Sequence, residues 1–374
     1  MFSLLLIAQA FSLTGGYIQT LVLSWVAASL GGGLYSLAAY MIACYLPVAV
    51  LSYPFGRWLA KQNQKPWLLL SECTLAALSL LLWAAAKWEF LTFPFLLIFG
   101  AGWGVVRALQ TPIYQSLPRR LAKELSKGTA LLTVVTYGAR GLGPILGGLL
   151  YARFGAAIPF FINFCSFIPS VGLLCFLRLP RPKSGEKAAI KPYLPHLIEI
   201  FLLSFFGVNY NVTFVALVKD AGQGSASYGI ALGLLGLGAL LGFWLKSKTK
   251  RAPPIPLLMG GMGLIHLILA LLPNLWVCGL CILLYGGLDF WYFSTAAFRL
   301  SKAAPKEQVT AVMGLYTVVT VGAMPVGALF WSFAAKRFGL SSALCAIGIG
   351  LILLASIKLL YRNGAIHETS IRDL

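Results

Sequence analysis

Long apolar segments separated by short polar breaks constrain the fold of this chain more than any other feature of its sequence. A helix that crosses the hydrocarbon core of a bilayer needs about 20 predominantly apolar residues, and twelve segments of roughly that length occur here. Only 10% of the 374 residues are charged, whereas a soluble domain carries about 25%. The sequence therefore predicts an all-α membrane protein with twelve transmembrane helices. The predicted spans are 3–29, 34–56, 67–87, 90–115, 129–151, 156–178, 194–218, 225–245, 255–273, 275–299, 309–332 and 340–361.

The few charged residues are strongly unbalanced, with 29 Lys and Arg against 10 Asp and Glu. In a soluble protein this excess would indicate a nucleic-acid partner. Here 22 basic residues fall in alternate loops and the C-terminal tail, five fall in the other loops, and Arg107 and Arg140 lie inside spans. Because Lys and Arg are enriched in cytoplasmic loops, we expect a multi-pass protein of the cell inner (cytoplasmic) membrane with both termini cytoplasmic. We expect the lipid bilayer, not nucleic acid, as its surroundings.

The seven cysteines all fall within apolar spans, where a free thiol behaves as a small hydrophobic group. Cys278 and Cys281 form a lone C-x-x-C pair, which becomes a zinc or redox site only with further ligands, so packing is the favoured interpretation. We expect no metal and no cofactor. The first apolar segment lacks a basic leading region and a small-residue cleavage site, and we interpret it as a transmembrane helix, not a signal peptide.

Two short segments recur at one spacing. Residues 133–139 (TVVTYGA) recur at 317–323 (TVVTVGA), and residues 153–155 (RFG) recur at 337–339, in each case 184 positions later. A six-helix unit repeated once produces such a spacing, and two such halves are typical of secondary transporters with a midplane substrate site between them. The predicted organisation is an N-terminal six-helix half at 1–178, a cytoplasmic linker at 179–192, a C-terminal six-helix half at 193–361 and a cytoplasmic tail at 362–374.

The fifth predicted span contains the segment GPILGG at 143–148, and the sixth contains Asn163 and Phe167. These residues resemble the antiporter motif G-P-x-x-G-G of the major facilitator superfamily, in the drug–proton antiporter and siderophore-exporter branch that includes the enterobactin exporter. Glycines allow close helix approach, and neighbouring helices tolerate a bend at proline. Ordinary small-residue packing is the alternative interpretation. The motif residues are Arg140, Gly143, Pro144, Gly147 and Gly148.

Two loops depart from the pattern of that superfamily. Residues 56–65 are similar to the family loop G-x-L-A-D-R-x-G-R-R but have Ala60 in place of its aspartate, and the second copy, 242–251, has Lys246 there. The resemblance implies a cytoplasmic gate in these loops whose charge pair is missing or built differently. Gly16 likewise occupies a region of the first span where relatives often carry an acid. The expected gate residues are Gly56, Lys61, Lys65, Gly242 and Lys246.

Away from the last residues of the predicted spans, five charged side chains lie inside the membrane: Glu72, Arg107, Arg140, Glu199 and Asp289. A charge at the bilayer centre costs at least about 2.5–3.5 kcal/mol on insertion scales, so each is a candidate functional residue. A carboxylate in a low-dielectric site can take up a proton near neutral pH, and we predict proton coupling at Asp289 first and Glu199 second. Glu72 lies near one end of its span, and its position is compatible with a role either in helix packing or in gating. A structural Arg107–Asp289 ion pair is the alternative role for these two residues.

Polar and aromatic side chains recur at three- and four-residue intervals on the first, fourth and tenth spans, so each set shares one helix face. The resemblance implies that these helices, with the seventh, line the substrate cavity. Two arginines beside Trp and Tyr favour a partly anionic, aromatic substrate, although packing is the alternative role for the aromatic residues. The predicted cavity residues are Gln9, Gln19, Trp103, Arg107, Gln110, Asn209, Tyr285 and Tyr292.

These features predict a monomeric secondary transporter that exports a small organic molecule, drug or siderophore, by proton-coupled alternating access. An importer or facilitator of a siderophore or metabolite with the same fold is the alternative. An integral-membrane enzyme is disfavoured, because the chain has only three histidines and lacks the H-E-x-x-H, paired-aspartate and phosphate-loop motifs.

Overall fold

The computed structural model describes residues 2–30, 33–59, 62–121, 125–177, 191–207, 210–249, 253–272, 274–304 and 309–365. These residues form thirteen α-helices, one short 3-10 helix and no strand, which confirms the all-α class. The helices are α1 Phe2–Ser29, α2 Leu34–Leu59, α3 Gln64–Lys87, α4 Phe93–Leu121, α5 Leu125–Phe154, α6 Ala157–Cys175, η1 Lys191–Tyr193, α7 Leu194–Gly207, α8 Tyr210–Asp220, α9 Ser225–Lys248, α10 Ile255–Leu271, α11 Leu275–Ala303, α12 Val309–Phe338 and α13 Leu340–Ala365.

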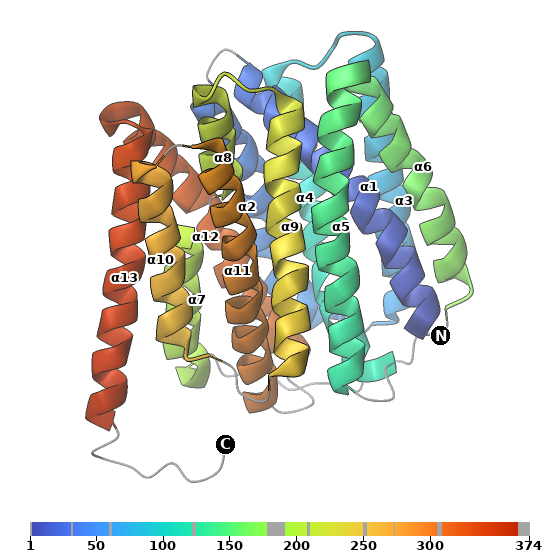
Figure 1. The fold of residues 1–374 in the computed structure, drawn as a ribbon. Coiled ribbons are helices and arrows are strands. Elements are labelled where there is room, and N and C mark those ends of the chain that lie inside the picture. The colour runs from blue at the N-terminus through green and yellow to red at the C-terminus, as the bar shows by residue number, and fades with distance from the viewer. Residues whose placement is uncertain are drawn as a thin grey trace.

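Every predicted span lies on a helix, and the seventh corresponds to the successive helices α7 and α8. Several helices are longer than the predicted apolar spans, because helical backbone hydrogen bonds can continue into polar residues. The span predicted at 309–332, for example, is part of a helix, α12, that ends at Phe338. In the described part of the chain, ten helical segments are long and apolar enough to cross a membrane, and α10 is a shorter apolar helix of 17 residues. The chain is a multi-pass membrane protein whose helices form one bundle, with Phe2 and the end of α13 at the same end (Figure 1).

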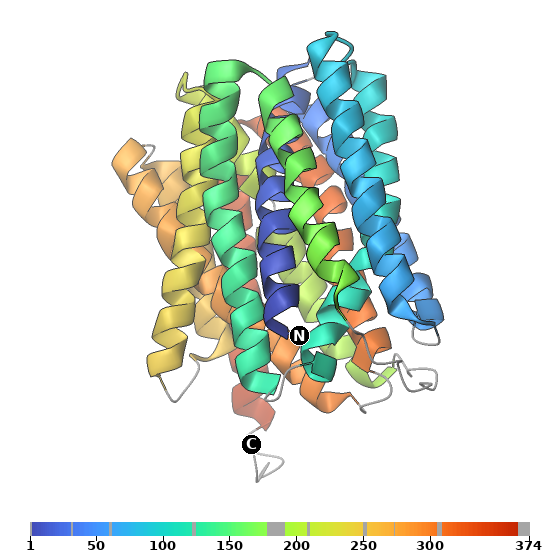
Figure 2. The same cartoon turned by 90° about the vertical axis from the view of Figure 1, so that its right-hand side faces the viewer.

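The same kinds of helix pair occur in the first and second parts of the chain. α3 packs against α6 as α10 packs against α13, and α2 packs against α4 as α9 packs against α11. Two further pairs, α5 with α9 and α2 with α12, join the two parts. α5 and α9 lie side by side in both views (Figures 1 and 2). Most of the predicted linker and residues 366–374 of the predicted tail lie outside the described residues.

The two ends of the bundle differ in how its apolar core is joined. At the end away from Phe2, one large buried cluster includes the last turns of α1, the first turns of α2 and side chains of α8 and α9. At the end that contains Phe2, there are two separate small clusters: one from α1–α4 and α6 with Leu177, the other from η1, α7, α11 and α12 packed against Tyr53. The apolar core therefore joins the two parts of the chain extensively at the end away from Phe2, whereas at the other end Tyr53 of α2 is the first-part residue that packs on the cluster of the second part.

Polar and aromatic contacts tie the parts together at that same end. The Nζ atom of Lys219 donates to the backbone oxygen of Ala28, at 2.5 Å, where α1 ends. The ring of Trp25 stacks on that of Tyr228, with centroids 6.0 Å apart. A lysine near the C-terminal end of α1 also favours the partial negative charge of that helix end. These contacts close the bundle at the end away from Phe2.

Candidate functional site

A cavity of about 300 Å³ lies among the middle turns of the helices. Most of its wall comes from α1 and α3–α6, and Leu232, Leu235, Val321 and Met324 add an apolar side from α9 and α12. The polar and aromatic residues of the wall are Ser12, Tyr17, Gln19, Thr20, Tyr45, Ser79, Trp103, Arg107, Arg140, Asn163 and Phe167. The cavity is thus cationic on one wall and apolar on the other.

Arg107 brings a positive charge to this wall, and among the described residues no carboxylate lies in direct contact with it. Its Nη1 atom donates to Oε1 of Gln110 at 2.6 Å, and its guanidinium lies 5.5 Å from the ring centroid of Trp103. Within the described residues it forms no ion pair. A guanidinium held by an amide and an aromatic face can bind an anionic group in a bidentate geometry.

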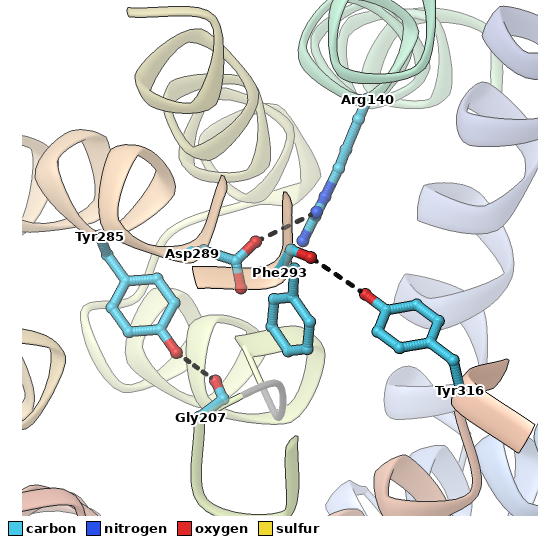
Figure 3. A network of polar contacts seen from close by, with 6 residues as sticks. All are labelled: Arg140, Gly207, Tyr285, Asp289, Phe293 and Tyr316. Carbon is cyan, nitrogen blue, oxygen red and sulfur yellow. Dashed lines mark hydrogen bonds and ion pairs between the residues drawn. The ribbon is translucent and has the colours of Figure 1, made fainter. Parts of the chain in front are cut away.

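Arg140 lines the same cavity and is the partner of Asp289. Its Nη1 atom lies 3.3 Å from Oδ2 of Asp289, and the pair joins α5 to α11 (Figure 3). The Asp289 side chain is only 2% exposed, and its Oδ1 atom has no hydrogen-bond partner among the described residues. The ion pair considered above between Arg107 and Asp289 is therefore wrong, because the first arginine bonds to Gln110 and the second takes the carboxylate.

Three tyrosines tie α11 to its neighbours and do not line the cavity. Tyr285 donates to the backbone oxygen of Gly207, at 2.5 Å, where α7 ends, and Tyr316 donates to the backbone oxygen of Phe293 at 3.5 Å (Figure 3). Tyr292 is fully buried, with its hydroxyl 3.4 Å from Glu199. Of the predicted cavity residues, Tyr285 and Tyr292 thus act in helix packing.

Two other predicted residues also lie off the cavity wall, and Asn209 lies outside the described residues. Gln9 is buried, and its Oε1 atom has no hydrogen-bond partner in the described part of the chain. Gln110 lies behind the wall and supports Arg107. The remaining predicted residues, Gln19, Trp103 and Arg107, do line the cavity.

Glu199, the second predicted proton-coupling residue, lies on α7 away from the cavity. Its carboxylate pairs with Lys358 of α13, and both side chains are partly exposed. An ion pair at this degree of exposure contributes little to stability. The structure places Glu199 where it ties α7 to α13.

Glu72 is fully buried inside the helix bundle, although the sequence placed it near the end of a span. Its Oε1 atom accepts hydrogen bonds from Gln110 at 2.8 Å, Tyr114 at 2.8 Å and Ser12 at 3.4 Å, and its Oε2 atom accepts one from Ser170 at 3.1 Å. The sequence did show that Gln110 and Tyr114, two of the partners of Glu72, share a face of the fourth span with Arg107. The sequence alone did not indicate which carboxylate that face meets.

A second polar network lies nearer the cavity. The Nδ2 atom of Asn163 donates to Gln19 Oε1 at 2.7 Å and to Ser79 Oγ at 2.9 Å, which joins α6 to α1 and α3. Ser79 was not predicted as a site residue, because a serine in an apolar helix commonly bonds to its own backbone, as this one also does to the backbone oxygen of Leu75. Gln19, Ser79 and Asn163 all contribute to the cavity wall.

The GPILGG segment holds α5 between two other helices. An ideal Cβ at Gly147 would lie 2.8 Å from the backbone oxygen of Ile18 in α1, and one at Gly148 would lie 2.6 Å from that of Ser225 in α9. Gly143 also faces α1, and Pro144 lines the cavity. Side chains at the glycine positions would therefore push α5 away from its neighbours.

The predicted gate residues that the structure describes bond within their own parts of the chain. Lys65 donates to the backbone oxygen of Cys175, at 2.6 Å, where α6 ends, and Lys246 donates to Ser294 at 2.8 Å. Gly242 packs on Gly287 and accepts a hydrogen bond from Trp291. Gly56 is buried in α2, and Lys61 lies outside the described residues.

The two cysteines of the C-x-x-C pair are both free thiols on α11. In the described residues no group of three or more His, Cys, Asp or Glu side chains is arranged to hold a metal ion.

Comparisons with known proteins identify the architecture. The family model described as "Major Facilitator Superfamily" matches residues 5–328, while no curated protein matches the chain. The solved human organic anion transporter MFSD10 (TETRAN) is similar, with a TM-score of 0.76 at 15% identity over 95% of this chain and 98% of that one.

Two bacterial structures are also similar. A homologue of the human lysosomal transporter Spinster, inward-facing and unoccupied, has a TM-score of 0.71 at 15% identity over 96% of each chain. A homologue of the iron transporter ferroportin, outward-facing, has a TM-score of 0.70 at 17% identity over 97% of this chain and 99% of that one. At such identities the likeness is one of fold.

Proposed function

We propose that this chain, which belongs to the Major Facilitator Superfamily, exports a small organic molecule with an anionic group across the cell inner membrane, coupled to protons. The chain is a membrane transporter of this superfamily; we propose its direction, its substrate and its coupling to protons. The observation that carries it is the mid-bundle cavity with Arg107 and Arg140 in its wall. A cation inside the membrane is costly unless it is paired, and Arg140 already pairs with Asp289, so Arg107 is the cavity cation that most favours an anionic ligand.

Two halves, 1–178 and 193–361, are proposed to rock against each other around this cavity. The recurrence of the helix pairs α3–α6 and α10–α13 supports this division. Contacts between the halves at the end away from Phe2, and separate apolar clusters at the other end, suit a state closed on one side. With both termini cytoplasmic, that state faces inward.

The Arg140–Asp289 pair is proposed to be the coupling element. A proton on Asp289 removes its negative charge and weakens its hold on Arg140, and the unpartnered Oδ1 atom offers a place for that proton. The likeness of residues 143–148 to an antiporter motif supports exchange of proton for substrate, and with it a drug- or siderophore-type cargo.

The same pair also favours a second candidate, an importer. If protonation of Asp289 frees Arg140 for an anion, proton and anion bind together, and an inward proton gradient then drives uptake. The experiment is accumulation of radiolabelled salicylate, an aromatic carboxylate, by proteoliposomes containing the purified protein.

The direction of the pH gradient separates the candidates. Accumulation above that of protein-free liposomes under the same gradient is the quantity compared. When an acidic lumen drives it, antiport and export are supported, whereas an acidic exterior supports symport and import. Equilibration that is insensitive to the gradient supports a facilitator. No protein-dependent flux of salicylate or other aromatic carboxylates would contradict the anionic-substrate proposal.

A further inference from the structure

The most completely bonded charged side chain of the described residues, Glu72, has no part in the function proposed above. It is 0% exposed and lies among α1, α3, α4 and α6. We infer that Glu72 is a second proton-binding site of this protein and that Gln110 couples it to Arg107 in the cavity. The proton site stands on the geometry alone, whereas its role in coupling rests on the proposed function.

The contacts of Glu72 allow the site to exist with or without a proton. Three of its four partners are the hydroxyls of Ser12, Tyr114 and Ser170. A hydroxyl both donates and accepts, and it changes role by rotating its hydrogen. When Oε2 carries a proton, Ser170 can turn from donor to acceptor at the same 3.1 Å separation. The carboxyl group can therefore gain or lose a proton without moving a heavy atom.

Gln110 connects this carboxyl group to the cavity through the two ends of one amide. Its Nε2 atom donates to Glu72 at 2.8 Å, and its Oε1 atom accepts from Arg107 at 2.6 Å. These two bonds fix the orientation of the amide. If the amide were reversed, its NH₂ group would face the N–H donor of Arg107 and its oxygen would face the carboxylate oxygen of Glu72, so neither hydrogen bond could form. An anion that draws Arg107 into the cavity therefore disturbs the bond that Gln110 makes to Glu72.

The charged surroundings of Glu72 are simple. Arg107 and Tyr114 of α4 are the charged and titratable groups that face it in the described part of the chain. α1 and α6 contribute only hydroxyls and carry no charged residue. A change in the charge balance at Arg107 is thus the main electrostatic change that Glu72 can sense.

A purely structural role is the competing interpretation, because a satisfied polar network can also hold four helices together. The two roles differ in one observable, since a structural Glu72 keeps one protonation state and a proton-binding Glu72 does not. Infrared difference spectroscopy between acidic and alkaline buffer reports the carboxyl C=O band of a protonated buried acid. It needs no transported molecule, so a failure of the transport proposal leaves its result intact.

The experiment compares purified wild-type protein with Glu72→Gln and with Asp289→Asn, the matched control that removes the other buried carboxyl. We expect a titrating C=O band that is lost in Glu72→Gln and kept in Asp289→Asn. In Gln110→Leu the same band should remain at a shifted frequency, because one hydrogen bond to the carboxyl is gone. That variant keeps the test decisive if Glu72→Gln fails to fold.

Two results would overturn the proton site: no band that depends on Glu72 at any accessible pH, or an unshifted band in Gln110→Leu. The coupling has its own test, addition of salicylate to wild-type protein at constant pH. A change in the Glu72 band that is absent in Arg107→Gln supports coupling through Gln110. The same change in both proteins would contradict it.

Discussion

Two buried carboxylates in this transporter are stabilised in opposite ways. Glu72 receives four hydrogen bonds from uncharged groups, all on helices of the first part of the chain. Among the described residues, the carboxylate of Asp289 has one partner, the cation Arg140 on a helix of the other part, and its second oxygen is unpaired.

The two carboxylates should respond differently to the proposed rocking motion. The bonds of Glu72 lie within one proposed half, so movement of that half as a unit does not by itself break them. The Arg140–Asp289 pair joins α5 to α11, which belong to different proposed halves, so separation of the halves would lengthen or break it and its strength would enter the conformational equilibrium directly. Substitutions that remove interactions within one half and substitutions that remove interactions between the halves should therefore have different effects on stability and transport.

The largest effect is expected for Asp289→Asn, which leaves Arg140 as an uncompensated buried charge. Removing one partner of a buried pair typically costs about 3–5 kcal/mol. We expect a strong loss of thermal stability in detergent and loss of gradient-driven salicylate accumulation. The double variant Asp289→Asn with Arg140→Gln should recover stability but not accumulation. Wild-type accumulation by the single variant would rule out this carboxylate as the coupling group.

Arg107→Gln should act on substrate binding within one half and leave the inter-half pair intact. A hydrogen bond to a charged group contributes about 1.5–3 kcal/mol, so we expect the apparent salicylate affinity to fall roughly ten- to a hundredfold, with little change in thermal stability. Initial uptake rates against salicylate concentration measure this. Unchanged affinity would exclude Arg107 as the anion-binding group.

Gly236→Ala tests the close contact between α9 and α5, the helix that carries Arg140. An ideal Cβ at Gly236 would lie 2.3 Å from Cα of Gly141, and overpacking of this kind typically costs about 1–3 kcal/mol. Thermal unfolding should show the loss. Gly16→Ala is the matched control, because nothing lies within 4 Å of its ideal Cβ. Equal stability of the two variants would contradict the tight packing.

The smallest effect is expected for Lys219→Met, which removes the lysine of α8 from the end of α1. A cation at a helix C-terminus contributes about 0.3–1 kcal/mol, and up to about 2 kcal/mol when partly buried. We expect spin labels on α1 and α8, at the end away from Phe2, to report a larger open population. Lys87→Met is the control, since Lys87 lies over Trp83 of its own helix. If Lys87→Met increased the open population as much as Lys219→Met, a lysine contact between helices would have no greater effect than a lysine contact within one helix, and the prediction would be contradicted.

The helices could be predicted well because the signal lies in each segment alone. Twelve apolar stretches predict helices wherever they occur, and the all-α class is confirmed. Helix ends such as Phe338 were less predictable, since backbone bonding continues into polar residues. The two-half division, the inner-membrane location and the cytoplasmic termini remain predictions.

The candidate site was predictable only in part. Periodicity placed Trp103, Arg107 and Gln110 on one helix face, and the structure has the first two on the cavity wall with the third just behind. The same argument on the tenth span selected Tyr285 and Tyr292, which instead bond to α7. A helix face is set by spacing, but whether that face meets a cavity or a neighbour depends on how the helices are rotated and packed.

Hydropathy and the cost of a buried charge are properties of each segment, so the amino-acid sequence was enough to predict the all-α class, the membrane setting and the short set of intramembrane charges. The partners of those charges became known from the packed helices: Arg140 for Asp289, and four uncharged groups for Glu72. The physical reason is that a partner is chosen by distances across helix interfaces, between residues as far apart in the chain as 140 and 289.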